Sequence, residues 1–223
     1  MSSHTKAENL IKLKQNSKLS HVEELLYFTV EEWKKNEKIL LKKIVNTFYN
    51  QEVIIRSSAI GEDSNSSSNA GNFSSFQHVS TISKNLKQKI NLVIKSYHKK
   101  KNYNKKNQIL IQTQSSQITT SGVIFTKHVK NNGPYYNIDY EDGKQTDSVT
   151  KGISKDSVSI FRKSDVAFIP KKWKKLISCV KEIESIFHSD ELDIEFGITN
   201  SKVIIFQVRP ITQLSNLKST ISE

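Results

Sequence analysis

The stretch LDIEFGITNSKVIIFQVRP, residues 192–210, contains two apolar runs separated by the polar turn 199–201. A turn this short joins antiparallel neighbours, so the runs 192–196 and 203–208 predict a β-hairpin. Side chains alternate between the two faces of a strand, so one face of the hairpin is predicted to be polar. The residues expected on that face are Asp193, Glu195, Gln207 and Arg209.

Two acids, an amide and an arginine on one sheet face admit two interpretations. Carboxylate and amide oxygens suit Mg²⁺, which keeps several waters and bridges to nucleotide phosphates, while Arg209 suits a phosphate oxygen. Alternatively, the face is the solvated side of an edge hairpin, in which Glu195 and Arg209 form a surface ion pair. The hairpin alone does not decide between a metal site and a solvated face.

A second polar segment begins where the predicted strand 53–55 ends, in the sequence VIIRSSAIGED. Arg56, Ser57 and Ser58 supply a guanidinium, two hydroxyls and backbone N–H groups, which together suit phosphate oxygens. In the Ser/Asn/Gly-rich loop that follows, Ala70-Gly71 permits close approach of the backbone to a polyphosphate. The alternative is an ordinary serine-rich surface loop.

The chain has 223 residues and a formal net charge of +12, which favours nucleotides, nucleic acids or anionic surfaces as partners. Arginine occurs only at Arg56, Arg162 and Arg209, and the other basic residues are lysines. Such a lysine excess is typical of AT-rich coding, so an arginine here indicates a site that needs a planar, bidentate donor. Arg162 has no such context and is interpreted as a surface residue.

The same inventory excludes several classes of protein. No apolar run approaches the roughly 18 residues of a membrane span, and no apolar secretory signal is found, which together indicate a cytoplasmic protein without a membrane partner. The single cysteine, Cys179, excludes an intramolecular disulfide and a cysteine metal cluster. Nucleic-acid binding is a less favoured alternative, supported by the lysine-rich segment 95–108 with Tyr97 and Tyr103 as stacking residues.

Apolar periodicity predicts the remaining elements. The predicted helices are 6–15, 30–50, 81–98 and 171–187. The predicted strands are 109–111, 123–125, 135–140 and 158–161. Because strands and helices do not alternate regularly, the pattern favours an α+β fold.

Four segments, in order, resemble the nucleotide-binding region of the phosphoenolpyruvate synthase and pyruvate phosphate dikinase family. VIIRSSAIGEDSNSSSNAGNFSSFQHV at 53–79 is similar to its V-x-V-R-S-S-A-x-x-E-D stretch and A-G-x-x-x-[ST] loop. SGVIFTK at 121–127 is similar to S-G-V-x-F-T-[RK], and 193–212 to D-[IM]-E-[WF] … Q-x-R-P-I-T. TKAENLIKL at 5–13 resembles the opening G-K-A-x-x-L segment without its glycines.

The resemblance implies an ATP-grasp domain with two lobes around a nucleotide cleft, 1–107 and 108–212, followed by a frayed tail, 213–223. It implies ATP and Mg²⁺ as cofactors. The residues implied to contact ATP are Lys6, Arg56, Ser57, Ser58, Gln112, Thr126 and Arg209. The residues implied to hold Mg²⁺ are Glu195 and Gln207, with Asp193 nearby. Catalysis would come from positioning and charge neutralisation, chiefly by Arg56 and Arg209.

Two departures from the family pattern bear on the expected reaction. YYNIDYEDGKQTDSVTKG at 135–152 stands where most relatives have G-L-G-E, so Asp147 is the candidate for the missing acid. This version resembles members encoded with surface-polysaccharide genes, such as glutamine kinases. None of the six histidines lies in the family's T-x-G-G-x-x-S-H-x-A motif, and we expect no acceptor domain after Pro210.

We therefore expect an ATP-dependent phosphotransferase domain that performs the nucleotide half-reaction, with the phosphohistidine and acceptor supplied by a separate domain in trans. The alternative from a different class is a non-catalytic nucleotide-binding remnant of a split or truncated enzyme. A histidine-bearing partner separates the two, because only the first would then form AMP.

Overall fold

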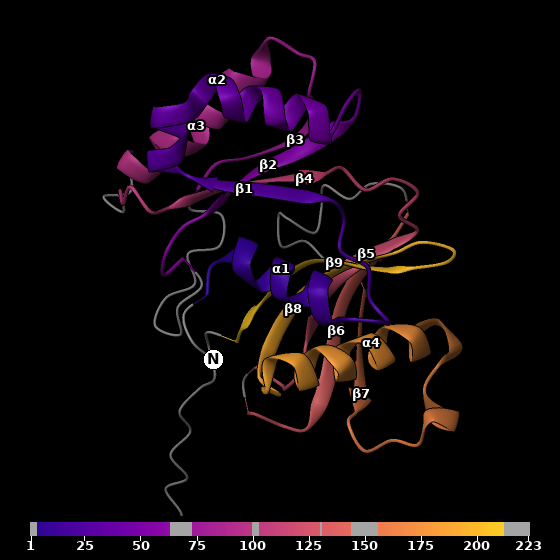
Figure 1. Ribbon diagram of the computed structural model, residues 1–223. Helices are drawn as coiled ribbons and strands as arrows, with labels where there is room; N and C mark the ends of the chain where they lie inside the picture. Colours follow the sequence, from indigo (N-terminus) through magenta and orange to yellow (C-terminus); the bar gives the residue numbers. More distant parts are fainter. Residues whose placement is uncertain (1–3, 63–72, 100–102, 130, 144–155, 212–223) are drawn as a thin grey trace, which may run out of the picture.

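The computed structural model describes residues 4–62, 73–99, 103–129, 131–143 and 156–211. Within these ranges the chain forms two sheets, one above the other, each covered on one face by helices (Figure 1). The expected α+β fold with two lobes is confirmed. No helix in the described ranges is long and apolar enough to cross a bilayer.

Some expectations concern positions outside the described residues. These are the Ala70-Gly71 approach, the acid Asp147 and the tail 213–223.

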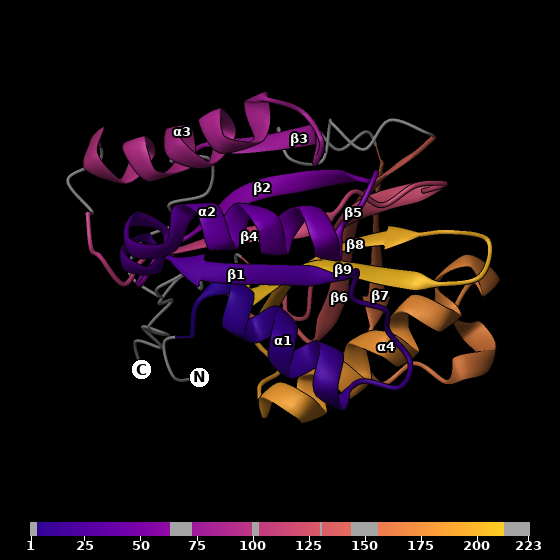
Figure 2. The ribbon, with the colours of Figure 1, turned by 45° about the horizontal axis from the view of Figure 1, so that its top comes forward.

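The first lobe is a four-stranded sheet in the order β1-β4-β2-β3, and every neighbouring pair is antiparallel. Its strands are β1 (Leu25–Thr29), β2 (Glu52–Ser58), β3 (Ser75–Ser80) and β4 (Gln108–Thr113). The helices α2 (Val30–Thr47) and α3 (Asn85–Lys99) lie on one face of this sheet (Figure 2). A capping box begins α2: the Thr29 hydroxyl accepts from the Glu32 N–H, and the Glu32 carboxylate accepts from the Thr29 N–H.

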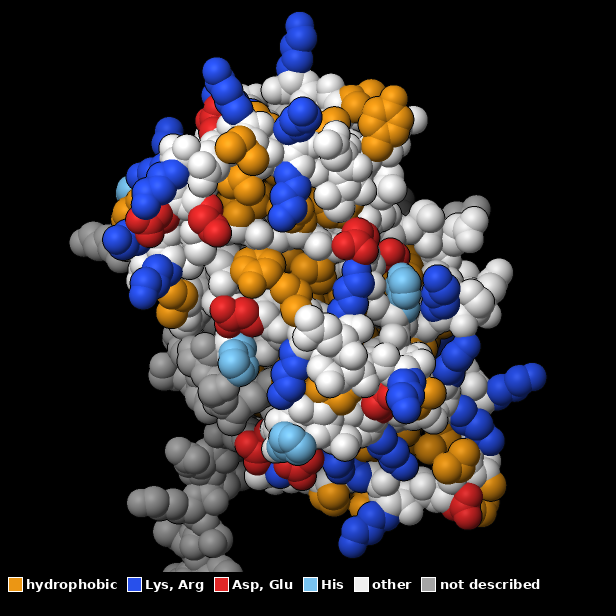
Figure 3. All heavy atoms as spheres, viewed as in Figure 1, with side chains coloured by type: hydrophobic (Ala, Val, Ile, Leu, Met, Phe, Trp, Pro, Cys, Tyr) orange, Lys and Arg blue, Asp and Glu red, His pale blue; other side chains and the backbone are white. Residues whose placement is uncertain are grey.

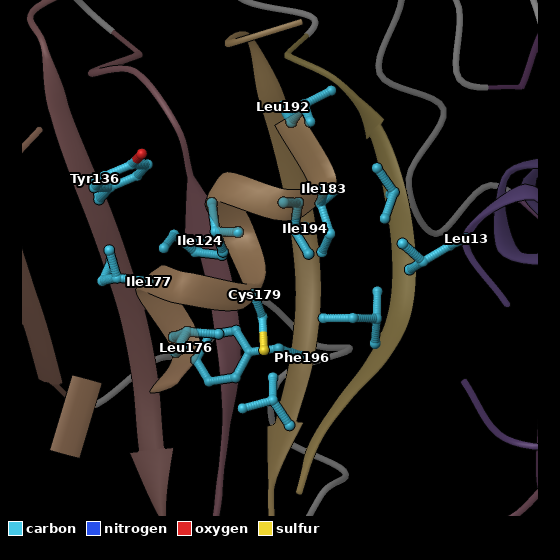
Figure 4. Packing of buried hydrophobic residues seen from close by; sticks show 14 of the residues in the cluster. Leu13, Ile124, Tyr136, Leu176, Ile177, Cys179, Ile183, Leu192, Ile194 and Phe196 are labelled. Carbon is cyan, nitrogen blue, oxygen red and sulfur yellow. The ribbon is translucent and has the colours of Figure 1, made fainter. Parts of the chain in front are cut away.

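The second lobe is a five-stranded antiparallel sheet in the order β7-β6-β5-β8-β9. Its strands are β5 (Thr120–Phe125), β6 (Tyr135–Asp142), β7 (Asp156–Phe161), β8 (Leu192–Ile198) and β9 (Val203–Pro210). A short 3-10 helix, η2 (Val166–Phe168), precedes α4 (Lys171–Phe187). The apolar face of α4 packs on the sheet against Ile124, Ile194 and Phe196 (Figure 4).

The first helix, α1 (Lys6–Asn16), precedes the first lobe in sequence but packs against the second. Its buried residues Ala7, Leu10 and Leu13 belong to the hydrophobic core of α4 and the second sheet. The helix lies beside α4 (Figure 2), and Asn9 Nδ2 donates to Val208 O of β9 at 2.9 Å. The assignment of this helix to a lobe formed by 1–107 is therefore wrong.

The expected boundary between 107 and 108 is wrong for β4 as well. This strand lies between β1 and β2 of the first sheet, and Ile109 and Ile111 belong to the core under α2 and α3. A short apolar run does not show which sheet it joins, because the partner strands are selected by tertiary packing. The same limit explains why β1 and β3 were not predicted.

Alternation gives each sheet a second face, opposite its helices; we call these the inner faces. On the first sheet, Arg56 pairs with Leu110 and Ile54 pairs with Gln112, so these four side chains share one face. Leu110 belongs to the second lobe's core, which shows that this face is turned toward the second lobe. The inner face of the second sheet carries Ser121, Asp139, Asp193, Glu195, Gln207 and Arg209.

The glycine of the SGVIFT segment is required by the spacing of β5 and β6. Gly122 pairs with Tyr140, and a Cβ at Gly122 would lie 2.3 Å from Asp139 O and 3.0 Å from the Tyr140 Cβ. The Tyr140 ring packs edge-on against Trp173 of α4, with centroids 4.7 Å apart, so β6 is held against the helix. This part of the motif therefore has a packing role.

The substitution Gly122→Ala is predicted to lower the free energy of unfolding by about 1–3 kcal/mol, the usual effect of forcing extra atoms into a packed core. Urea denaturation measures the change. Ser157→Ala on the exposed strand β7 is the control and should stay within about 0.5 kcal/mol of the parent. Equal stability of Gly122→Ala and the parent would contradict the packing role.

Candidate functional site

The loop after β2 is organised by one buried carboxylate, that of Glu62, which is 3% exposed. Its Oε1 lies 2.7 Å from Lys6 Nζ and accepts from Ser57 Oγ at 2.9 Å. Its Oε2 accepts from the Ala59 N–H at 2.9 Å. The loop and the start of α1 are therefore joined by a single side chain, which the sequence analysis did not single out.

The first turn of α1 is bound to the first sheet by a chain of hydrogen bonds. The Ser58 hydroxyl accepts from the Ala7 N–H at 3.0 Å and donates to Gln108 Oε1 at 3.3 Å. Thr5 Oγ1 donates to the same Gln108 oxygen at 2.6 Å. The structure thus brings Lys6 and the Arg56-Ser57-Ser58 segment together, although they are some fifty residues apart.

The two serines differ from expectation in one respect. Both Ser57 and Ser58 are buried, at 4% and 0% exposure, and their hydroxyls bind protein groups. Their role in the described structure is to fix the loop and α1. A contact of either hydroxyl with phosphate stays a prediction.

Arg56 extends from the inner face of the first sheet to the second lobe. Its Nη1 donates to Phe206 O of β9 at 3.4 Å. Phe206 is the extra residue of a β-bulge, between Gln207, which pairs with Glu195, and Ile205, which pairs with Phe196. Arg56 therefore reaches the part of β9 that leads directly into Gln207.

The β8–β9 hairpin forms as predicted, with the four polar side chains on one face. Asp193 pairs with Arg209, and Glu195 pairs with Gln207, so all four side chains share the inner face. Arg209 donates from Nε to Asp193 Oδ2 at 2.8 Å, and its Nη2 lies 2.7 Å from the same oxygen. The ion pair therefore joins Arg209 to Asp193, not to Glu195. No hydrogen bond or ion pair of the Glu195 carboxylate is found among the described residues.

Two buried amides on the inner faces have unused hydrogen-bonding groups. Gln112 is 1% exposed, and neither its Oε1 nor its Nε2 has a partner. Gln207 is 4% exposed, and its Nε2 has no partner. Leaving such groups unsatisfied costs about 1–3 kcal/mol each, so both amides are poised for a ligand or water.

Thr126 does not match its expected place in a ligand cleft. Its side chain is 0% exposed, its hydroxyl donates to Asp190 O at 2.6 Å, and it accepts from the Leu192 N–H at 2.7 Å. These bonds tie the end of β5 to the start of β8. Thr126 therefore has a structural role, and its one hydroxyl donor is already used.

The inner-face residues suit Mg²⁺ only together with oxygens from a ligand. The described residues contain no group of three His, Cys, Asp or Glu side chains that could hold a metal by itself. Mg²⁺ is commonly bound by one or two carboxylates together with water and substrate phosphates. Glu195 and the amide oxygen of Gln207 fit that pattern, whereas Asp193 is engaged by Arg209.

Neither tyrosine of the lysine-rich segment 95–108 is free to stack on bases. Tyr97 is fully buried, and its hydroxyl donates to Gln108 O at 2.6 Å. Tyr103 stacks on His98 with centroids 3.9 Å apart and lies under Lys34. Lysines are spread over both lobes on the face seen in Figure 3, which is typical of a solvated basic surface. Tyr97 is therefore a core residue and cannot serve as a stacking residue, whereas binding of nucleic acid to the lysine-rich surface stays the less favoured alternative.

The comparisons with known proteins give the fold. The sequence matches no protein-family description and no curated protein. The structure is similar to D-alanine–D-alanine ligase from Helicobacter pylori, with TM-score 0.55, 13% identity, and coverage of 95% of this chain and 55% of the ligase. The chain has the ATP-grasp fold.

Two further solved structures agree. The VanG D-Ala:D-Ser ligase from Enterococcus faecalis has TM-score 0.53 and 10% identity, with coverage of 94% of this chain and 52% of the ligase. D-alanyl-alanine synthetase A from Vibrio cholerae has TM-score 0.50 and 12% identity, with coverage of 96% and 57%. The chain spans about half the length of these proteins, and identities this low show the fold alone.

The interpretation of Arg162 as a surface residue is wrong. Its side chain is 19% exposed and forms a two-pronged ion pair with Glu184 of α4, at 2.5 and 3.1 Å. Nη1 also donates to Thr126 O at 2.7 Å, and the guanidinium lies 4.6 Å from the centre of the Tyr136 ring. The third arginine therefore joins β5, β6 and α4 on the side of the second sheet away from its inner face.

Arg162→Lys keeps the positive charge but cannot form both hydrogen bonds to Glu184. We therefore predict that it lowers the free energy of unfolding by about 1–3 kcal/mol. Chemical denaturation measures this loss, and Lys163→Gln at the exposed neighbouring position serves as the control. The folded variant should keep the ligand affinity of the parent. An unchanged stability would show that the two-pronged geometry of the Arg162–Glu184 contact adds nothing to stability beyond the charge.

Proposed function

We propose that the chain binds Mg-ATP between its two inner faces and performs the nucleotide half-reaction of a phosphotransferase similar to phosphoenolpyruvate synthase and pyruvate phosphate dikinase. The observation that carries the proposal is the contact of Arg56 with Phe206 O, because it brings the phosphate-binding segment of one lobe to the Glu195–Gln207 pair of the other. Two lobes of an ATP-grasp fold supply the surrounding architecture.

The three cations of the proposed site are not equivalent. Lys6 is paired with Glu62, and Arg209 is paired with Asp193, so a nearby carboxylate offsets part of each charge. Among the described residues, Arg56 has only a carbonyl oxygen 3.4 Å away as a partner. A bound phosphate is therefore stabilised most by Arg56, whose charge no carboxylate offsets. The carboxylates of Glu62 and Asp193 hold Lys6 and Arg209 in position.

Mg²⁺, held by Glu195 and Gln207, would neutralise phosphate charge. The chain's own residues bind and orient the triphosphate, and the buried amide of Gln112 offers a donor and an acceptor to the nucleotide. In this proposal the β-phosphoryl group passes to a histidine supplied by a separate domain, AMP is the leaving group, and water takes the γ-phosphoryl group as free phosphate. Catalysis is then positioning and charge neutralisation.

A second candidate is an ATP-dependent ligase, favoured by the names of the three similar solved structures. A ligase that activates a carboxylate with the γ-phosphoryl group releases ADP, whereas the proposed half-reaction releases AMP. Nucleotide products formed with a phosphohistidine domain added in trans separate the two. AMP that depends on the added histidine supports the phosphotransferase, ADP formed with a carboxylate and an amine supports the ligase, and ATP binding without either product supports a non-catalytic module.

Arg56→Lys is predicted to weaken the binding of Mg-ATP about tenfold or more, because the lysine keeps the charge but cannot make a two-pronged contact. Arg209→Lys should have a smaller effect, since Asp193 already shares its charge. Isothermal titration calorimetry of the full chain measures both affinities, with thermal unfolding recorded for each variant.

Lys42→Gln on the exposed side of α2 is the matched control and should leave the affinity unchanged. If both arginine variants bind Mg-ATP as tightly as the parent while remaining folded, the proposed site is wrong.

A further inference from the structure

The inner face of the second sheet continues beyond the proposed nucleotide site onto β5 and β6. Tyr136 and Ile138 point into the core under α4, so Asn137 and Asp139, which alternate with them, lie on the inner face. Asp139 pairs with Val123, which in turn pairs with Glu195. One row of side chains therefore runs from Asp139 across the sheet to the proposed metal ligand.

Asp139 has an unusual setting for a carboxylate. It is half-buried, and it makes no hydrogen bond or ion pair with another described residue. Burial alone raises the pKa of this carboxyl above its ordinary value, which means that the surroundings do not compensate its charge. A bound cation would supply that compensation.

Ser121 supplies an independent sign of a ligand beside Asp139. It lies on the same inner face of β5, two residues from Val123, and it pairs with Glu141 on one side and Gly197 on the other. Its side chain is 2% exposed, yet its hydroxyl has no hydrogen-bond partner. A buried hydroxyl without a hydrogen-bond partner is rare unless a water or a ligand supplies that partner.

The chemistry of these strands favours an organic cation over an anion or a bare metal ion. The sequences TSGVIF and YYNIDYED of β5 and β6 contain no lysine or arginine, so a carboxylate-bearing substrate has no counterion on these strands. The acids of the described residues are too far apart to form a three-ligand metal group. An ammonium group carries three donors and suits acceptors that lie on neighbouring strands.

We propose that this part of the inner face, Ser121 and Asp139, binds the ammonium group of a small organic amine, with Asp139 as counterion and the Ser121 hydroxyl as a hydrogen-bond acceptor. The inference rests on the proposed nucleotide site and makes the amine the second compound held in the cleft. Two strand spacings, roughly 10 Å, separate β6 from β8, so the amine would lie beside the metal-bound phosphates.

The test is an NMR titration of the ¹⁵N-labelled full chain at constant ionic strength, with butylammonium as the probe and butyrate as the anion of similar size. Butylammonium is expected to cause saturable shifts of the Ser121, Val123 and Asp139 amides, and butyrate none. Asp139→Asn should weaken the binding of butylammonium about fivefold or more. Asp156→Asn, which removes an exposed acid on β7, should leave the affinity for butylammonium unchanged.

Mg-ATP affinity separates this proposal from the preceding one. Asp139→Asn should bind Mg-ATP within about twofold of the parent. Absence of saturable butylammonium shifts, equal shifts with butyrate, or unchanged binding by Asp139→Asn would overturn the amine site while leaving ATP binding intact. Loss of Mg-ATP binding by the folded Asp139→Asn would also overturn it, since Asp139 would then belong to the nucleotide site. If Asp139→Asn does not fold, Ser121→Ala decides, and unchanged butylammonium affinity in that variant overturns the proposal.

Discussion

The ion pair between Lys6 and the buried Glu62 links the two lobes. Glu62 belongs to the loop that follows the first sheet, whereas Lys6 begins a helix whose apolar face is part of the second lobe's core. Removing both charges from water is costly, and the cost is offset only when further hydrogen bonds complete the pair. Ser57 and the Ala59 N–H supply those bonds. The same carboxylate thus joins the lobes and shapes the loop proposed to hold phosphate.

Each of the three arginines joins different elements of the fold. Arg162 joins the end of β7 to α4 and β5, Arg209 joins β9 to β8, and Arg56 joins the first lobe to β9. A forked guanidinium suits all three places, in agreement with the argument that this lysine-rich chain keeps arginine where lysine would not serve. Only Arg56 spans the two lobes, which is why it carries the proposed function.

Local patterns in the sequence predicted local structure well. The period of two in residues 192–210 correctly placed Asp193, Glu195, Gln207 and Arg209 on one face of a hairpin, and apolar periodicity predicted the start of α2 at residue 30. Sheet membership could not be read in this way: β4 joins the first sheet because its partners are selected by packing. Thr126 fits the motif in sequence, but its hydroxyl is used by backbone groups that only the fold brings near. Asp139 and Ser121 were missed, although the alternation in YYNIDYED could have placed Asp139 on a polar face.

The central claim is that one nucleotide is held by both inner faces at once. The most direct measurement replaces Mg²⁺ by paramagnetic Mn²⁺ in the ATP complex and records the broadening of amide resonances in the ¹⁵N-labelled chain. Broadening is predicted on both sheets, at Ser57 and Gln112 and at Glu195 and Gln207, with the α3 lysines Lys87 and Lys95 unaffected. Broadening confined to the lysine-rich surface of α3, or to one sheet only, would contradict it.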